Sequence, residues 1–309
     1  MNIKKILVVT QGIEKVFLGK PMGGLEYRSY LLFKDYNNVN FLSTGYNSTN
    51  VKVISSKNKI LGFFNDFKIL NYDAVCFFSF SRKTVFQILL AKMFNKKIIY
   101  FVCSNGEVGL NLNYVNSYYK WVPKVIFPFV DLFITQTDVQ RKEIQKKYKK
   151  ECQVIPNPVV INNNTKYKNN HFILWVGRNH PIKGTDILCE TVSQLTNIKF
   201  KLIGINKLDI KVNSKNAEVL GRINIPEMDE YYNSATILIN TSYSEGYPNS
   251  FLQSLANKTP IISYSANPDN FLERSGGGYS ARGNKAEFIS KIRELYDNEA
   301  ELKRMSQSG

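Results

Sequence analysis

Short apolar segments alternate with amphipathic segments along almost the whole chain, and this alternation is the feature that most constrains the fold. Apolar runs such as residues 74–80 and 236–240 have the length of a strand that is buried on both faces. Each is followed by a segment with helical spacing of its apolar residues. Strands that alternate with helices are typical of parallel sheets covered by helices. The sequence therefore predicts an α/β fold.

The individual elements follow from the same pattern. In the first half we expect strands at residues 5–10, 40–43, 52–55, 74–80, 97–103, 132–135 and 153–155, and helices near 25–33, 84–94, 115–129 and 138–148. In the second half we expect strands at 171–176, 199–203, 218–220, 236–240 and 260–263, and helices near 185–195, 226–233, 249–256, 285–297 and 299–306. Ser81 and Thr137 are expected to cap the helices that follow them.

One segment interrupts the alternation and predicts a domain boundary. Pro156-Asn157-Pro158 is followed by a polar run rich in Asn and Lys that extends to Asn170. Such composition between two periodic regions is typical of a linker. We therefore expect two Rossmann-like, doubly wound domains, residues 1–158 and 159–309, with ligands at the carboxyl ends of their strands.

Charge is distributed unevenly between the two halves. Residues 1–160 contain 23 Lys and Arg against 10 Asp and Glu, a net charge of +13, whereas the rest of the chain has a net charge of +3. A basic first half favours an anionic partner such as a membrane surface or a charged lipid. The aromatic and basic residues Tyr114, Tyr118, Tyr119, Lys120, Trp121, Lys124, Phe127 and Phe129 predict a membrane-facing surface there, unless the aromatic side chains form a buried helix face.

Several classes of protein are disfavoured. The first apolar segment is too short for a signal peptide, and no stretch approaches the roughly 18 apolar residues of a spanning helix. We expect a cytoplasmic protein, or one at the inner face of the membrane. The four cysteines form no C-x-x-C pair and are expected to be buried free thiols. With two histidines and no D-x-D triplet, the sequence predicts no metal site and no cofactor.

Two loops contain the residues best suited to bind a nucleotide-sugar. The strand that ends at Val176 is followed by a loop with Arg178 and Lys183, and a helix begins after Gly184. Two cations beside helix N-terminal amides form an anion site suited to a diphosphate. After residues 236–240, Glu245 precedes a predicted turn, and Gln253 lies eight residues further on, inside the next helix. These two polar groups are suited to sugar and ribose hydroxyls.

These motifs together resemble the GT4-like family of retaining glycosyltransferases, which have the GT-B fold. The resemblance includes Arg178, Lys183-Gly184, Glu245-Gly246-Tyr247-Pro248 and Leu252-Gln253-Ser254-Leu255-Ala256, and in the first half Met22-Gly23-Gly24-Leu25-Glu26 and Val154-Ile155-Pro156-Asn157-Pro158. It implies catalytic roles for Glu245, Arg178 and Lys183. It also implies that the donor is bound by Arg178, Lys183, Gly23, Gly24, Gly246, Tyr247, Pro248, Asn249, Ser250 and Gln253.

The sequence departs from the family pattern in three places. Gln253 stands where the family has a second Glu, and the segment Cys103–Glu107 stands where many members have a His near the sugar. Asn105 and Glu107 are candidates to replace that His. The family also ends with a helix that crosses back onto the first domain, and we expect that helix to be missing from this chain.

The resemblance implies a metal-independent, retaining hexosyltransferase. Such an enzyme moves a sugar from a nucleotide-diphosphate sugar to a glycan or lipid-linked acceptor, as in polysaccharide or glycolipid synthesis. Its first domain would bind the acceptor and its second the donor. Two alternatives stay open: a non-catalytic nucleotide-sugar-binding partner of a transferase, which the Gln253 substitution favours, and a nucleotide-sugar epimerase. A nucleic-acid partner is suggested by charge alone, and no recognition motif accompanies it.

Overall fold

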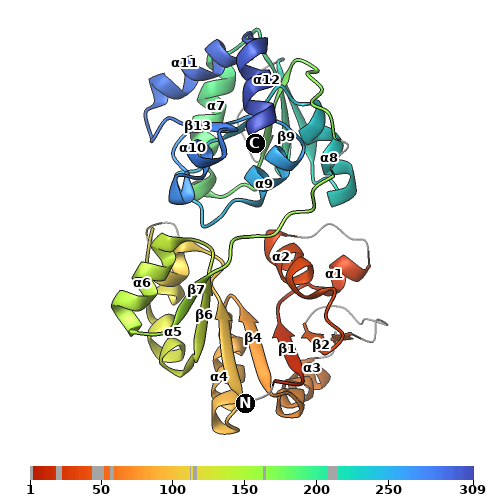
Figure 1. The fold of residues 1–309 in the computed structure, drawn as a ribbon, viewed down its shortest axis with the longest axis vertical. Coiled ribbons are helices and arrows are strands. Elements are labelled where there is room, and N and C mark those ends of the chain that lie inside the picture. The colour runs from red at the N-terminus through yellow and green to blue at the C-terminus, as the bar shows by residue number, and fades with distance from the viewer. Residues whose placement is uncertain are drawn as a thin grey trace. The chain divides into compact units, whose positions relative to one another are not determined.

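The computed structural model describes residues 3–18, 23–43, 52–55, 59–111, 113, 117–162, 165–207 and 215–309, with main chain only at Lys59, Arg82, Tyr119, Ile225 and Pro226. The chain divides into two compact units, Met1–Pro158 and Val159–Gly309. In Figure 1 the first unit runs from red to yellow-green and the second from green to blue. Each unit is described by itself.

The first unit contains a parallel sheet of seven strands in the order β3-β2-β1-β4-β5-β6-β7. Its strands are β1 (Ile6–Val9), β2 (Val39–Leu42), β3 (Val53–Ile54), β4 (Ala74–Phe78), β5 (Lys97–Phe101), β6 (Leu132–Thr135) and β7 (Cys152–Val154). The central strand β4 is buried along its whole length, as the apolar run predicts. Chain order reverses beside β1, so β1 and β4 flank the switch point of this sheet.

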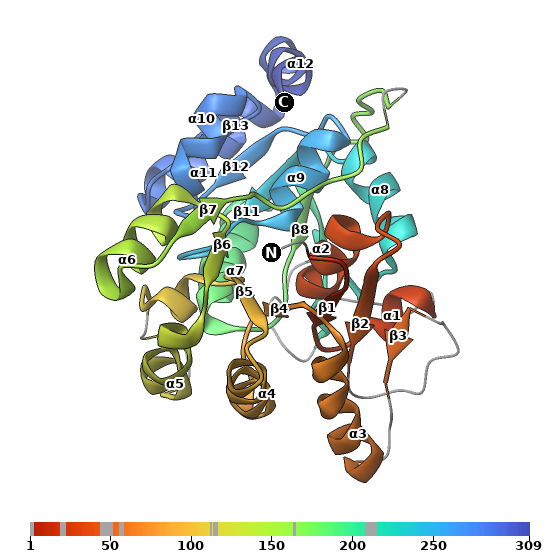
Figure 2. The same ribbon diagram turned by 60° about the horizontal axis from the view of Figure 1, so that its bottom comes forward.

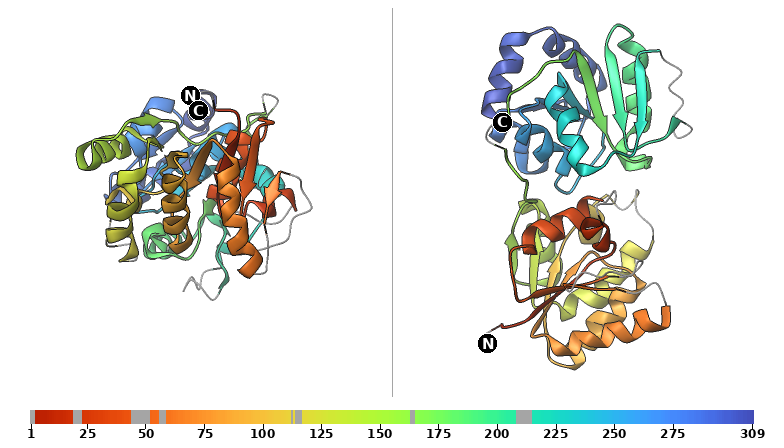
Figure 3. Two further views of the ribbon diagram at one scale, coloured as in Figure 1. Left: turned by 90° about the horizontal axis from the view of Figure 1, so that it is seen from below. Right: turned by 90° about the vertical axis from the view of Figure 1, so that its right-hand side faces the viewer.

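Helices cover both faces of this sheet (Figure 3). One face packs against α1 (Glu14–Phe17) and α2 (Gly24–Phe33), and the other against η1 (Phe67–Asn71), α4 (Arg82–Met93), α5 (Tyr118–Ile126) and α6 (Asp138–Tyr148). The helix α3 (Lys59–Asp66) is joined to α4 by side-chain bonds, and two short 3-10 helices, η2 (Asn105–Val108) and η4 (Phe127–Phe129), flank α5.

The second unit contains a parallel sheet of six strands in the order β10-β9-β8-β11-β12-β13. Its strands are β8 (Phe172–Val176), β9 (Lys199–Ile203), β10 (Ala217–Gly221), β11 (Ile237–Asn240), β12 (Ile261–Ser263) and β13 (Gly278–Ser280). One face packs against α7 (Thr185–Gln194), α11 (Lys285–Tyr296) and α12 (Glu299–Ser308). The other packs against α8 (Ile225–Ser234), α9 (Asn249–Ala256) and α10 (Phe271–Ser275). Two 3-10 helices, η5 (Pro181–Lys183) and η7 (Pro268–Asn270), lie in loops.

The predicted α/β class, with two doubly wound parallel sheets, is confirmed. Every predicted strand is present, and both predicted caps are confirmed, because Ser81 accepts from the amide of Thr84 and Thr137 accepts from the amide of Gln140. Within the described residues, three α-helices and one strand were not predicted, α1, α3, α10 and β13, and neither were the 3-10 helices η1, η2, η5 and η7. All of these except α3 have five residues or fewer, too short for a periodic pattern, and α3 has four of its apolar side chains in solvent.

The segment that joins the two sheets, residues 155–170, is hydrogen-bonded to one unit at its start and to the other at its end. Nη2 of Arg28 donates to the carbonyl of Ile155 (3.2 Å), and Nε2 of Gln136 donates to Oδ1 of Asn157 (2.8 Å), both within the first unit. On the other side the amide of Lys168 donates to the carbonyl of Asn233 in the second unit (3.1 Å). The predicted linker, residues 156–170, is therefore partly bound to one unit or the other.

Candidate functional site

The candidate site of the second unit lies where β8 and β11 end. These two strands are neighbours in the sheet, with Ile173 opposite Ile237 and Trp175 opposite Ile239. Chain order reverses beside β8, so the crevice at their carboxyl ends is the switch point of this sheet. Both motifs singled out from the sequence begin at these two strand ends.

The loop after β8 supplies two cations. Arg178 is exposed, and no ion pair of its guanidinium is found in the described part of the chain. Lys183 ends the 3-10 helix η5, which His180 caps by accepting the amide hydrogen of Ile182 at its Nδ1 (3.3 Å). Burial, and then the positive charges of Arg178 and Lys183, lower the pKa of His180. The imidazole is therefore held neutral between two cations.

The loops after β8 and β11 are joined to each other. The amide of Tyr243 donates to the carbonyl of Ile182 (2.9 Å), and Oγ1 of Thr241 donates to the carbonyl of Lys183 (2.7 Å). Below them Nε1 of the buried Trp175 donates to Oγ1 of Thr241 (2.9 Å). These bonds fix the position of the Lys183 backbone relative to the loop after β11.

Gly184 is required where the two loops meet. Its φ is +60°, a conformation that favours glycine, and a Cβ atom built there would lie 2.2 Å from the carbonyl oxygen of Thr241. A side chain at this position would push the loops apart. The Lys-Gly pair of the motif therefore has a local structural reason.

Lys183 and Glu245 form an ion pair at the centre of the site. Nζ of Lys183 lies 2.5 Å from Oε1 of Glu245, and both side chains are partly exposed. Oγ of Ser242 donates to the same carboxylate oxygen (2.7 Å), and Asn240 in turn accepts from the amide of Ser242 (3.1 Å). The carboxylate is therefore positioned by residues of its own loop and by a cation of the neighbouring loop.

The N-terminus of α9 follows directly. Gly246 and Tyr247 form a bend, and the ring of Tyr247 packs edge-on against Phe271 at 5.5 Å between centroids. Pro248 is the N-cap residue and offers no side-chain cap, and α9 begins with Asn249 and Ser250. A helix that begins beside Glu245 and Lys183 directs amide groups toward the same edge of the sheet.

Gln253 lies on the second turn of α9 and faces α8. Its Oε1 accepts from the hydroxyl of Tyr232 (3.3 Å), a residue that is fully buried. The side chain is half-buried and belongs to the same helix as Asn249 and Ser250. Its predicted role toward a ribose stays a prediction.

Gly23 and Gly24 lie in the first unit, apart in sequence from the other predicted site residues. Gly23 is the N-cap of α2 and Gly24 is the first residue of the helix. The carboxylate of Glu26 lies against both Gly23 and Gly12, since a Cβ atom at either glycine would come within 3 Å of it. Met22, quoted in the same motif, lies outside the described residues.

The carboxyl edge of the first sheet has a buried carboxylate, Glu107. Its Oε1 accepts from the hydroxyls of Ser79 (3.0 Å) and Ser104 (3.3 Å). Its Oε2 accepts from the hydroxyl of Tyr100 (2.9 Å) and the amide of Cys103 (3.2 Å). Burial raises its pKa to about 7 against the lowering effect of these bonds. Glu107 is 1% exposed, and its carboxylate is bonded to residues of its own loop and to Ser79 and Tyr100. This burial favours the alternative that Glu107 does not replace the family His.

Asn105, the other candidate to replace the family His, accepts from Nε2 of Gln140 (3.0 Å) and is half-buried. Beside this loop, the buried guanidinium of Arg28 donates from Nη1 to the carbonyl of Val102 (2.8 Å) and lies 3.9 Å from Sγ of Cys103. All four cysteines are free, and the prediction that they are buried holds fully for Cys76 alone.

Sequence reasoning missed Ser242, His180 and Trp175 as parts of the site. Ser242 follows Asn240 with one residue between them, which is typical of an Asx turn, and this pattern was visible in the sequence. The bond from Trp175 to Thr241 had no local signal, because it depends on the pairing of β8 with β11.

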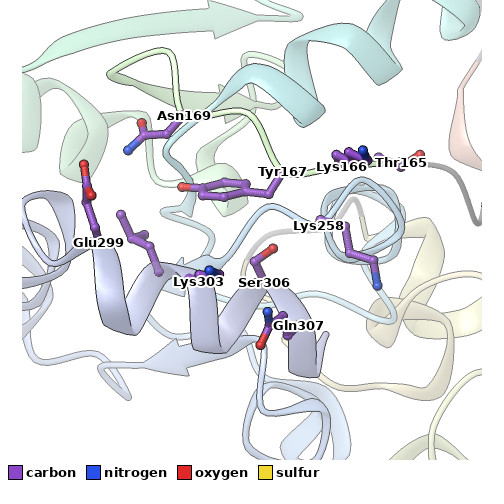
Figure 4. A pocket seen from close by; sticks show the side chains of 10 residues that line it. Thr165, Lys166, Tyr167, Asn169, Lys258, Glu299, Lys303, Ser306 and Gln307 are labelled. Atoms are coloured by element: carbon purple, nitrogen blue, oxygen red, sulfur yellow. The ribbon is translucent and has the colours of Figure 1, made fainter.

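A cavity of about 650 Å³ lies at the opposite edge of the second unit (Figure 4). Tyr167 and Asn169 line one wall, and both bond to Thr236 at the amino end of β11. Figure 4 shows the side chains of Glu299, Lys303, Ser306 and Gln307 of α12 on the other wall. This cavity shares no residue with the site at the strand ends.

The described residues contain neither a cluster that could hold a metal nor a helix that could cross a membrane. Across the described ranges, no three His, Cys, Asp or Glu side chains come close enough together to hold a metal ion. None of the helices within those ranges combines the length and the apolar character that crossing a membrane requires.

The geometry of the second unit suits an anionic ligand with hydroxyl groups. An exposed guanidinium, a lysine and helix N-terminal amides provide positive charge, and a carboxylate beside them accepts hydrogen bonds. Residues 170–298 match the family model of glycosyl transferases group 1. This range contains Arg178, Lys183, Glu245 and the start of α9. The second unit is therefore similar to the glycosyl transferases of group 1 over this range.

The chain is also similar in sequence to curated glycosyltransferases. An uncharacterized glycosyltransferase of Methanocaldococcus jannaschii is 27% identical over 191 residues, which are 58% of this chain and 53% of the relative. The chain therefore spans about half the length of the curated relative that it matches.

Solved structures show the fold. Sucrose-phosphate synthase from Thermosynechococcus elongatus has a TM-score of 0.73 at 12% identity, over 99% of this chain and 92% of that one. TarM of S. aureus, solved with UDP, has a TM-score of 0.63 at 19% identity, over 79% of this chain and 54% of that one. The predicted GT-B fold, with two Rossmann-like domains, is confirmed.

Proposed function

We propose that this protein is a retaining glycosyltransferase. It moves a hexose-type sugar from a nucleotide-diphosphate sugar to a glycan or lipid-linked acceptor, in the synthesis of a polysaccharide or glycolipid, and it uses no metal. The observation that supports this most strongly is the ion pair of Lys183 with Glu245 at the switch point of the second sheet, beside the exposed Arg178.

In this proposal Arg178 and Lys183 neutralise the diphosphate. Charge builds on the leaving phosphate as the anomeric bond breaks, and cations held in place stabilise that charge. The bond of Thr241 to the carbonyl of Lys183 and the restriction at Gly184 hold the lysine loop in position before substrate arrives. The acceptor attacks from the face that the leaving group departs from, and the phosphate takes its proton.

Glu245 positions the hydroxyls of the donor sugar. Its carboxylate is oriented by Ser242 and Lys183 and is partly exposed, so it remains able to accept from a ligand. Amides at the start of α9, from Asn249 and Ser250, would meet phosphate oxygens, and Gln253 would bond to the ribose. A similar fold that was solved with UDP supports a nucleotide-diphosphate donor.

The first unit is the acceptor side in this proposal. Its net positive charge favours an anionic or lipid-linked acceptor. Gly23 and Gly24, at the N-terminus of α2, would approach the donor phosphates. Glu107 and Arg28 would hold the acceptor loops in shape and would not touch substrate, because both are buried.

The donor site is tested by thermal unfolding with UDP-, GDP-, ADP- and TDP-sugars. A ligand at a hundred times its dissociation constant stabilises a protein by about 2.7 kcal/mol, which shifts the unfolding midpoint measurably. We expect one nucleotide to stabilise the wild type and not the double variant Arg178→Ala, Lys183→Ala. The control is Lys199→Ala, at the amino end of β9, which should bind like the wild type.

Failure of every nucleotide-sugar to shift the midpoint would contradict the donor site. Turnover is measured separately, with the same donor and a mixture of glycan and lipid acceptors. Binding without turnover would favour the alternative, a non-catalytic nucleotide-sugar-binding partner, which Gln253 suggests. Activity that EDTA abolishes would contradict metal independence, and an inverted anomeric configuration in the product would contradict retention.

A further inference from the structure

A contiguous apolar surface covers three neighbouring elements of the first unit. It is formed by the exposed side chains of Ile60, Leu61, Phe63 and Phe64 on α3, Phe67 on η1, and Phe86, Leu89 and Met93 on α4, with Phe94 after it. We call these nine residues the aromatic patch. Single exposed apolar residues need no explanation, whereas a contiguous group of this size marks an interaction surface.

Ring contacts join four members of the patch. The ring of Phe63 contacts those of Phe64, Phe67 and Phe86, with centroids 6.0, 5.5 and 5.6 Å apart, so the contacts run from α3 through η1 to α4. Phe67 also contacts Phe86 directly. These four rings form one exposed cluster, and the other five members are exposed on or next to the same helices.

The helix α3 is held in place by polar bonds on its inner side. Asp66 is buried, pairs with Lys83 (2.9 Å) and accepts from Nε2 of Gln87 (2.7 Å). Lys83 also donates to the carbonyl of Gly62 (2.9 Å). Because these bonds fix α3 against α4, its apolar residues point into solvent in a defined arrangement.

Further exposed side chains lie on α5, the helix that packs against α4. Figure 2 shows α3, α4 and α5 side by side, and α4 packs between η1 and α5. Trp121 and Val125, one helical turn apart, are exposed on α5, and Lys120 and Lys124 beside them are exposed as well. Of the aromatic residues predicted to face a membrane, Phe127 is buried in the core, and Tyr114 lies outside the described residues. The stretch is therefore mixed, with Lys120, Trp121 and Lys124 exposed and Phe127 buried, and its membrane role stays a prediction.

Most charges near the patch are positive. Among the described side chains of residues 60–97 there are five Lys and two Asp, and one of these lysines, Lys97, pairs with Asp131. Lys68 and Lys92 are exposed beside the patch. Of the two carboxylates, Asp66 is buried in its ion pair and Asp73 accepts from the amides of Lys4 and Lys5. A partner of this surface must therefore be both apolar and negatively charged.

The next helix on the same face is different, and the patch ends there. On α6 the charges are mixed: Asp138 pairs with Arg141 and Lys142, and Glu143 pairs with Lys147. Val139 is the large apolar side chain that this helix exposes within the described residues. The combination of apolar surface and unopposed positive charge is specific to α3, η1, α4 and α5.

We propose that the aromatic patch binds the surface of an anionic lipid bilayer. Aromatic, Leu and Met side chains enter the boundary between headgroups and acyl chains, and the lysines at the rim bind lipid phosphates. The proposal extends the acceptor side of the proposed function, since a lipid-linked acceptor is found at a membrane. It rests on no residue of the donor site, so the two proposals can fail separately.

Binding is measured by co-sedimentation with vesicles of phosphatidylcholine alone and with vesicles that also contain phosphatidylglycerol. We expect sedimentation with the anionic vesicles only, because each lysine near a negatively charged surface increases the affinity about fivefold. Salt screens this attraction, so added salt should weaken the binding. The triple variant Leu61→Ser, Phe64→Ser, Met93→Ser should lose at least about tenfold in affinity, since three apolar side chains no longer enter the bilayer.

A matched control replaces exposed apolar residues elsewhere. Val139→Ser, Val160→Ser, Ile161→Ser changes three side chains that are likewise at least half exposed, and it should bind vesicles like the wild type. Equal loss in both triple variants, or no sedimentation of the wild type, would overturn the proposal. So would a wild-type dimer that the first variant abolishes without any vesicle binding, because the patch would then be a protein interface.

Tryptophan emission provides an independent measurement. The chain has two tryptophans. Trp121 lies on α5, which packs against α4, and is half exposed, whereas Trp175 is buried in the second unit. Anionic vesicles should shift the emission of the wild type to shorter wavelength, and Trp121→Phe should remove the shift while the protein still sediments. A vesicle-induced shift that survives Trp121→Phe would contradict binding through this face.

Discussion

The two sheets have the same kind of switch point and use it differently. In the second unit, Arg178, Lys183 and Glu245 lie at the ends of β8 and β11, and all three are at least partly exposed. In the first unit, Arg28 and Glu107 lie beside the ends of β4 and β5, and both are buried. The charged side chains named at the edge of the second sheet are thus accessible to solvent, whereas Arg28 and Glu107 at the edge of the first sheet are not.

The difference indicates what each edge is for. A partly exposed charge can exchange its bonds for those of a ligand at small cost, whereas a buried charge is committed to its internal partners. The second edge is therefore built to meet a charged ligand. At the first edge, Arg28 and Glu107 are committed to internal partners and keep the loops rigid.

The largest expected effect comes from a substitution at the exposed edge of the second sheet. Gly184→Ala places a Cβ atom against the carbonyl of Thr241 at a positive φ, and we expect a loss of about 3 to 5 kcal/mol in the free energy of unfolding. The measurement is the emission of Trp175 in a Trp121→Phe background. Gly283→Ala is the control, with a φ of +87° but open space, and should lose about 1 to 2 kcal/mol. Equal losses would mean that the contact with Thr241 is unimportant.

The next largest effect comes from a substitution of a buried charge at the edge of the first sheet. Arg28→Met leaves the carbonyls of Val102 and Ile155 without their donor, and we expect a loss of about 3 kcal/mol in the stability of the first unit. Lys34→Met, near the C-terminus of the same helix and partly exposed, is the control. Stabilisation by nucleotide-sugar should be unchanged in the Arg28 variant. Its loss would show that Arg28 acts on the donor and would remove the distinction between the edges.

The pH dependence of stability sharpens the comparison. Burial raises the pKa of Glu107 from 4.5 to about 7, so between these values the folded state binds a proton that the unfolded state has released. The stability of the first unit should therefore fall as pH rises from 4.5 to 7 and then level off, with a total loss of up to about 3 kcal/mol. Denaturant unfolding at several pH values measures this slope.

Glu107→Gln should flatten that slope without unfolding the protein. Oε1 of the glutamine can accept from Tyr100 and Cys103, while its amide group donates to Ser79 or Ser104, whose hydroxyls can reverse. Glu151→Gln changes an exposed carboxylate of the same unit and should keep the wild-type slope. An unchanged slope in the Glu107 variant would mean that another buried group titrates.

The smallest expected effect concerns Gln253. Gln253→Glu restores the second carboxylate of the family motif, and a charge-assisted bond to a ribose hydroxyl should tighten nucleotide-sugar binding about fivefold. Tyr232 can still donate to the new carboxylate. Isothermal titration measures the change, and Gln253→Ala should weaken binding instead. No change in either variant would place Gln253 outside the donor site.

Local patterns account for what the sequence predicted well. The start and end of α9 follow from Pro248 and the apolar spacing after it, and β9 is found at the predicted residues. Arg178, Lys183 and Glu245 could be placed together because the parallel strands before them end at one edge. The element that the pattern missed and that matters most is α3, whose apolar residues face solvent and follow no buried periodicity.

What could not be predicted depends on contacts between distant segments. Glu107 is a charged residue in a loop sequence, and nothing near it indicates burial, since Ser79 reaches it from the end of another strand. Arg28 likewise finds its acceptors 74 and 127 residues away. Residues of this kind become recognisable only when the pairing of β4 with β5 is known.

The hydrogen bonds at the two ends of the linker indicate where the two units could be exchanged between related proteins. The first unit holds the chain up to Asn157 and the second holds it from Lys166, whose carbonyl accepts from Asn233. A crossover placed at positions 158–165 cuts none of these bonds, and those eight residues reach about 28 Å at most. Halves exchanged between relatives at this point would keep their own cores and their own strand-end loops, so the ligand preferences of each strand-end edge would be inherited separately.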